Sequence, residues 1–199
     1  MNRLYVKPKI NWVLPVKKTP KYIERNETER QKFIEYIDNL SEDIEIYYAD
    51  ESGFEEDYSR SYGYAARGER VFGEVYGTHF GRTSIVAALD KTNKLIAPFS
   101  FKGYMNGDLF EGWLEQIFVP YLENPQKSIL VIDNATHHRK EAICEIAEEH
   151  KFYVIFLPKY SPDLNPIEHI WACIKNWLRL HLHMYDSFSD GLLHAFKGR

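Results

Sequence analysis

Three acidic residues, Asp50, Asp133 and Glu168, lie where predicted secondary-structure elements begin or end. The hydrophobic pattern predicts that Asp50 and Asp133 each end a strand and that Glu168 opens a helix. Side chains at such positions can converge, because sites in sheets with parallel crossovers form at the carboxyl ends of strands. Carboxylates from separate elements can hold two divalent ions ~3.5–4 Å apart and so act on both oxygens of a phosphodiester displacement. The spacing therefore favours metal-dependent phosphodiester chemistry.

The two aspartates also have purely local explanations. Asp50 can close an Asx turn before Gly53, within the segment Asp-Glu-Ser-Gly. Asp133 can precede a helix whose free N–H groups are capped by Asn134 or Thr136. Taken singly, neither aspartate distinguishes a metal ligand from a turn or cap residue.

Glu168 likewise fits a local pattern. With Asn165 as N-cap and Pro166 at the first helical position, it occupies the capping-box site. The two roles are compatible, because the positive end of a helix dipole keeps a carboxylate ionised and ready to bind a cation. On the predicted helix, Glu168 projects at the edge of the apolar stripe, beside Trp171.

Other polar residues near the acids are weaker candidates. Glu51 follows Asp50 but points to the opposite face of the strand. His137 and His138 follow Asp133 closely and can contact DNA or a metal-bound water, although a structural role at a helix start is the more frequent one for histidine.

The elements that position the acids follow from the apolar periodicity. Segments rich in β-branched and aromatic residues predict strands at Ile44–Asp50, Val71–Tyr76, Thr83–Leu89, Leu95–Phe101, Ser128–Ile132 and Phe152–Leu157. Apolar residues at helical spacing predict helices that start at Asn26 and span Asp108–Leu122, Thr136–His150 and Asn165–His181. Early consecutive strands imply antiparallel pairing and the later alternation implies parallel crossovers, so we expect a mixed sheet with helices packed on it.

Charge is distributed unevenly along the 199 residues. The net charge is −4, yet residues 1–25 contain seven basic residues and one acid, which leaves −10 for the remainder. We therefore divide the chain into a basic arm at 1–25 and a body at 26–199, and expect phosphate contacts from the arm lysines Lys7, Lys9, Lys17, Lys18 and Lys21. A solvated, lysine-rich tail explains the same charge equally well.

Composition excludes several classes of protein. Hydrophobic residues make up 44% of the chain, enough for one core, and no apolar stretch reaches the ~20 residues of a membrane helix. Cys144 and Cys173 lack metal-ligand spacing, so we expect neither a zinc site nor a disulfide framework. These features favour a cytoplasmic protein.

Three sequence blocks resemble the DDE transposases of the Tc-mariner superfamily, most closely its bacterial insertion-sequence branch. They are YADESGF around Asp50, VIDNATHH around Asp133 and LPKYSPDLNPIEHIWACIK around Glu168, with thirty-four residues between the last two acids. The resemblance implies an α/β, ribonuclease-H-like fold with a mixed five-stranded sheet and helices on both faces. It also implies that the three acids are catalytic and bind two Mg²⁺ or Mn²⁺ ions.

The resemblance further implies double-stranded DNA as substrate, cleaved at transposon ends and joined to target DNA. Phosphate contacts are expected from Lys102, Arg139, Lys159 and Lys175, although each is more often an ordinary surface charge. We expect a homodimer associated with the bacterial nucleoid. Members of the family carry an N-terminal helix-turn-helix region. We expect that the chain is either a second reading frame normally joined to that region by frameshifting or a shortened form that lacks it.

Two alternatives remain open from the sequence. A ribonuclease or junction resolvase also uses clustered carboxylates and two metal ions. A truncated remnant that pairs with a full-length transposase and inhibits it would have the same sequence pattern.

Overall fold

The computed structural model describes residues 22–56, 65–70, 72, 81–136 and 138–197. The arm lysines Lys7 to Lys21, His137 and the predicted strand Val71–Tyr76, apart from Phe72, lie outside the described residues. The proposed division at residue 25 therefore stays a prediction. Among the described residues, no helix has the length and apolar character required to cross a membrane.

A five-stranded sheet forms the centre of the molecule, in the order β3-β2-β1-β4-β5. Its strands are β1 (Glu45–Glu55), β2 (Arg82–Leu89), β3 (Leu95–Lys102), β4 (Ser128–Ile132) and β5 (Tyr153–Phe156). β1, β2 and β3 pair antiparallel, whereas β4 is parallel to both β1 and β5. The predicted mixed sheet is thus confirmed, including the hairpin between β2 and β3.

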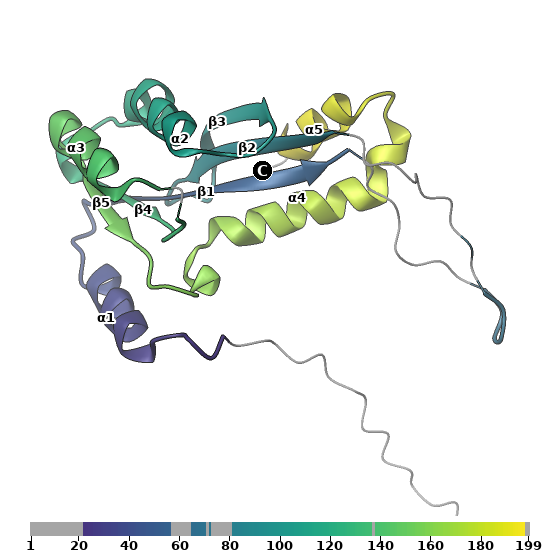
Figure 1. Cartoon of the computed structure of the whole chain (residues 1–199), viewed down its shortest axis with the longest axis horizontal. Coiled ribbons are helices and arrows are strands. Elements are labelled where there is room, and N and C mark those ends of the chain that lie inside the picture. Colours follow the sequence, from purple (N-terminus) through teal and green to yellow (C-terminus); the bar gives the residue numbers. More distant parts are fainter. Residues whose placement is uncertain (1–21, 57–64, 71, 73–80, 137, 198–199) are drawn as a thin grey trace, which may run out of the picture.

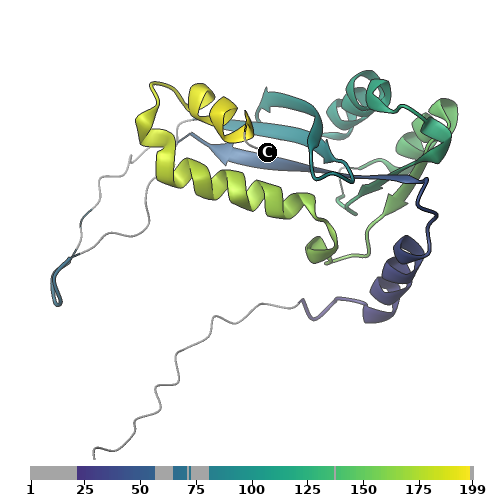
Figure 2. The same cartoon turned by 180° about the vertical axis from the view of Figure 1, so that it is seen from behind.

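Helices cover both faces of the sheet (Figure 1). One face carries α2 (Gly107–Trp113) and α3 (Lys140–His150). The other carries α4 (Ile167–His181), α5 (Phe188–Lys197) and α1 (Glu27–Asp38). The view from behind shows the same layers, with α4 running along the sheet and α1 beside the end formed by β4 and β5 (Figure 2).

Three clusters of buried apolar side chains join these layers. The first lies between the sheet and α2 and α3, and includes Trp113, Phe118 and Leu130. The second lies under α4 and α5, around Phe54 and Trp171. The third lies where α1 packs on β4 and β5. Its buried members are Ile129, Val131 and Leu157, and they are covered by Phe33 and Ile37 of α1 and by Leu40, which follows the helix.

Several helix boundaries differ from the sequence prediction. The helix predicted at Asp108–Leu122 is α2 continued by a π-helical turn (Leu114–Phe118) and a 3₁₀ turn (Val119–Tyr121), because Pro120 lacks the N–H that a regular helix requires. α3 starts at Lys140, not at Thr136. α5 was not predicted from the sequence, and its buried residues Leu192 and Ala195 belong to the second cluster.

Candidate active site

Asp50 lies inside a strand and not at its end, so the predicted Asp-Glu-Ser-Gly turn is wrong. β1 continues to Glu55 because the antiparallel pairing with β2 extends from Tyr48 to Glu55. The parallel pairing with β4 stops earlier, at Tyr48 opposite Val131. Continued by two positions, this register sets Asp50 opposite Asp133, which directly follows β4. The carboxyl end of β4 thus brings the two aspartates to neighbouring positions on adjacent strands.

Strand alternation also turns both aspartates to the same face. Alternate residues of β1 point to opposite faces of the sheet. Phe54 packs under α4, and Asp50, four residues earlier on the strand, therefore lies on the same face. On β4, Val131 faces the α1 and α4 side, and Asp133 follows it by two residues. Glu168 lies in the first turn of α4, on that side of the sheet. The three predicted acids therefore meet on one face.

Asp133 is held by two neighbours. Its Oδ1 accepts a hydrogen bond from the backbone N–H of Ala135 at 3.0 Å and lies 3.1 Å from Nε2 of buried His138. The His138 ring packs on Phe110 with ring centroids 4.2 Å apart. The expectation that Asn134 or Thr136 caps α3 is wrong, because Arg139 is the N-cap and has no side-chain cap bond.

The start of α4 likewise differs from the predicted capping box. Pro166 is the N-cap residue, and the link at the helix start is the backbone bond from Glu168 N–H to the Asn165 carbonyl at 3.2 Å. Asn165 is buried, and its Oδ1 has no hydrogen-bond partner among the described residues. Glu168 is an exposed residue at the start of the helix, and its side chain contributes to the lining of the cavity described below.

A cavity of about 730 Å³ is lined by all three acids. Burial, followed by the charges of Glu168, Glu51 and Asp133, raises the pKa of Asp50 well above its usual value. Burial and the charge of Asp133 also raise the pKa of Glu168, against the opposing charge of Lys175. Like charges so close disfavour full ionisation, and a bound cation would relieve this repulsion.

Hard oxygen donors of this kind suit Mg²⁺ or Mn²⁺. The described residues do not contain a preassembled group of three or more His, Cys, Asp or Glu side chains at metal-binding distances. The donor chemistry and the raised pKa of Asp50 and Glu168 are therefore the features that fit a divalent ion.

α4 contributes two further side chains to the site. The buried Trp171 donates a hydrogen bond from Nε1 to Oδ2 of Asp50, 3.1 Å away. Lys175 lies one turn further along, with Nζ 5.6 Å from the centre of the Phe54 ring, and burial lowers the pKa of this amine. The sequence placed Trp171 beside Glu168, three residues away on the same side of the helix, but did not predict its hydrogen bond to Asp50.

The other predicted phosphate contacts are spread over the surface. Lys102 pairs with Glu56, and Arg139 pairs with Asp108 and Glu111. Lys159 lines the acidic cavity and has no ion-pair partner within the described part of the chain. Of the four basic residues named from the sequence, Lys159 and Lys175 thus lie near the acids.

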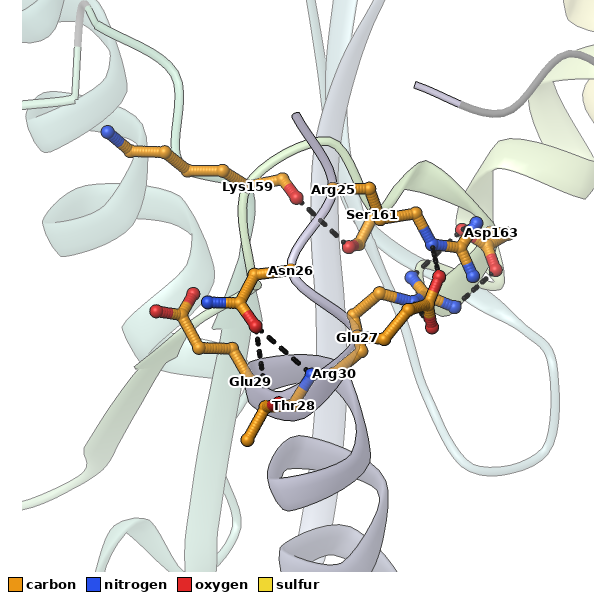
Figure 3. Close-up of polar contacts among 9 residues, drawn as sticks. All are labelled: Arg25, Asn26, Glu27, Thr28, Glu29, Arg30, Lys159, Ser161 and Asp163. Carbon is orange, nitrogen blue, oxygen red and sulfur yellow. Dashed lines mark hydrogen bonds and ion pairs between the residues drawn. The ribbon is translucent and has the colours of Figure 1, made fainter. Parts of the chain in front are cut away.

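α1 is fastened to the loop that leads into α4 (Figure 3). Arg30, 5% exposed, binds Asp163 through two nitrogens, at 3.1 and 2.7 Å. Arg25 lies 3.5 Å from the same carboxylate, and Glu27 contacts both arginines from the other side. Asp163 belongs to the 3₁₀ turn Pro162–Leu164. We call its contacts with Arg25 and Arg30 the clamp, and this clamp anchors the segment that leads to Glu168.

The chain is similar in sequence to one known family. The model of the family described as DDE superfamily endonuclease matches residues 45–190. No curated protein matches the chain significantly.

Solved structures similar to the chain include several complexes of one transposase. The Mos1 transposase paired-end complex with left transposon end has a TM-score of 0.66 at 18% identity, covering 93% of this chain and 60% of that one. The mariner Mos1 paired-end complex with Mg has a TM-score of 0.64 at 16% identity, covering 94% and 65%. The Mos1 strand transfer complex has a TM-score of 0.60 at 18% identity, covering 92% and 64%. The chain thus spans less than two thirds of these proteins, and the likeness confirms the ribonuclease-H-like fold.

Proposed function

Because the chain belongs to the DDE superfamily of endonucleases, we propose that it is the catalytic part of a transposase that cleaves DNA at transposon ends and joins them to target DNA. The observation that carries this proposal is that carboxylates from β1, the end of β4 and the start of α4 line one cavity. The shared fold of the Mos1 complexes supports the same function. The sequence blocks and the thirty-four residues between Asp133 and Glu168 support the bacterial insertion-sequence branch.

In this proposal Asp50, Asp133 and Glu168 are the catalytic residues and hold two Mg²⁺ or Mn²⁺ ions. Bound ions would polarise the phosphodiester and lower the pKa of the attacking water or hydroxyl. The residues of the chain orient the carboxylates for this task. Trp171 donates to one oxygen of Asp50, and His138 lies against one oxygen of Asp133, so these two side chains orient the two acids.

The substrate is double-stranded DNA in this proposal, with the basic arm at 1–25 as an additional phosphate-binding segment. Lys159 and Lys175 lie near the acids, where phosphate oxygens of a bound strand would pass. We further propose a homodimer in the bacterial cytoplasm, associated with the nucleoid.

Nicking of supercoiled plasmid DNA by the purified chain, with Mg²⁺ or Mn²⁺, tests this function. We expect Asp133→Asn to keep its circular dichroism spectrum and lose nicking by more than the ~10–100-fold typical of outer-shell changes, because the amide lacks the anionic charge that holds a cation. Asp186→Asn is the matched control, since this aspartate is exposed and does not line the cavity. Normal nicking by Asp133→Asn would contradict the assignment, and a preference for RNA–DNA hybrids or four-way junctions would favour another nuclease of the same fold.

A further inference from the structure

Two exposed tyrosines lie at the rim of the acidic cavity. Tyr22 is 56% exposed and Tyr160 is 47% exposed, and both line the cavity together with the three acids. Their ring centroids are 5.5 Å apart with an interplanar angle of 35°. The rings come from residues far apart in the sequence, so the fold assembles an aromatic surface beside the carboxylates.

The backbone at Tyr160 is strained. Its φ is +57°, in the left-handed region that glycine and asparagine adopt readily and that a bulky side chain disfavours. A turn residue selected only for its backbone would therefore be Gly or Asn. Strained residues of this kind concentrate at functional sites, where the surrounding structure holds them in position.

The surrounding structure holds this turn firmly. Asp163 is bound by Arg30 behind the turn, and the hydroxyl of buried Ser161 donates to the Lys159 carbonyl at 3.1 Å. Figure 3 shows that the Lys159 side chain extends away from the clamp. The tyrosine ring is thus presented by a pre-organised loop, which reduces the entropy lost when a ligand binds to it.

Partly exposed aromatic rings beside a basic residue can bind the nucleobases of a nucleic acid. Nucleobases stack on tyrosine, and each base so bound contributes substantially to affinity, whereas phosphates pair with lysine. A base within a duplex has both faces covered by its neighbours, so only an unstacked base can use such a surface. The rim therefore fits DNA whose strand is locally open next to the cavity.

We propose that Tyr160, supported by Tyr22, forms a stacking site for an unpaired nucleobase next to the phosphate that the three acids cleave. This inference rests on the proposed function, because it takes the cavity to hold a DNA strand. It adds that the strand is opened at the cavity and that one base leaves the helical stack, with Lys159 contacting the adjoining phosphate.

The test is binding of a short single-stranded DNA oligonucleotide that contains 2-aminopurine, whose fluorescence falls when it stacks on an aromatic ring. The chain is compared with Tyr160→Asn, Tyr160→Phe and the control Tyr153→Asn, which changes a tyrosine that is 61% exposed on β5. Ca²⁺ replaces Mg²⁺ so that binding is measured without cleavage. We expect Tyr160→Asn to weaken binding about tenfold and abolish the quenching. Tyr160→Phe and the control should behave like the parent chain.

Thermal unfolding separates this role from a structural one. Because asparagine accepts the left-handed backbone, Tyr160→Asn should unfold at the same temperature as the parent or higher, although it binds DNA less well. Tyr22→Leu provides a second variant, for which we expect a several-fold loss of binding. Unchanged quenching in Tyr160→Asn, or equal losses in Tyr160→Asn and Tyr160→Phe, would overturn the inference. Metal-dependent nicking by the parent chain is measured separately. Absence of nicking would contradict the proposed function, whereas the 2-aminopurine assay tests only the stacking site.

Discussion

The ion pair between Arg30 and Asp163 predicts that removing one partner lowers the free energy of unfolding more than removing the other. In Asp163→Ala the Arg30 guanidinium stays buried, and its nearest remaining carboxylate is Glu27 at 3.4 Å. This one longer contact replaces only part of the two bonds to Asp163, and a buried charge without full compensation is costly, so we expect a loss of about 3 kcal/mol in the free energy of unfolding. In Arg30→Met the Asp163 carboxylate, 53% exposed, stays hydrated and keeps Arg25 at 3.5 Å. We expect this variant to lose only about 1 kcal/mol, as for an exposed ion pair.

Urea unfolding of the parent, both single variants and the double variant measures these costs. With a slope of about 2 kcal/mol per molar urea, the midpoint should fall by about 1.5 M for Asp163→Ala and about 0.5 M for Arg30→Met. The double variant should be more stable than the sum of the single changes implies, because it leaves no unpaired charge. Equal costs, or a larger cost for Arg30→Met, would refute the reasoning that burial of Arg30 determines the asymmetry.

Three further predictions concern the acids and their neighbours. Trp171→Phe keeps the aromatic ring but removes the donor to Asp50, so we expect the Mg²⁺ concentration for half-maximal nicking to rise about tenfold with little change in thermal stability. His138→Leu should raise the same concentration through Asp133, whereas His138→Gln, which keeps a donor, should retain more of the activity. The pKa values of Asp50 and Glu168 are higher in the folded chain than their ordinary values of 3.8 and 4.5. The protonated acids therefore stabilise the folded chain fully below these ordinary values, and this stability is lost as the pH rises through the pKa values of the folded chain. Melting curves of the metal-free chain should show this decline, and Mg²⁺ should stabilise the chain more at about pH 8 than at about pH 5, because only ionised carboxylates bind it.

The sequence predicted the parts of the site that depend on local pattern. The buried run Ser128–Ile132 and the acid after it are recognisable because a strand covered on both faces is apolar throughout. The helix that starts near Glu168 is recognisable from its apolar stripe. Alternation and strand order then suffice to bring both elements to one face of the sheet.

Other features depend on partners far apart in the chain. The length of β1 could not be predicted, because its second half is extended by pairing with β2 across a polar segment that otherwise resembles a turn. The bond from Trp171 to Asp50 joins residues 121 positions apart, and the bond from Arg30 to Asp163 joins residues 133 apart. No local propensity specifies such pairs; they follow from the tertiary packing.

The position of α1 has a practical consequence for any shortened form of the protein. The segment recognised as the family domain begins at residue 45, after this helix. A fragment cut there would uncover Ile129, Val131 and Leu157 on the underside of the sheet, which are covered by apolar side chains of α1. Such a fragment is expected to aggregate, because large exposed apolar patches drive association. Expression of a soluble catalytic unit should therefore start upstream of Tyr22.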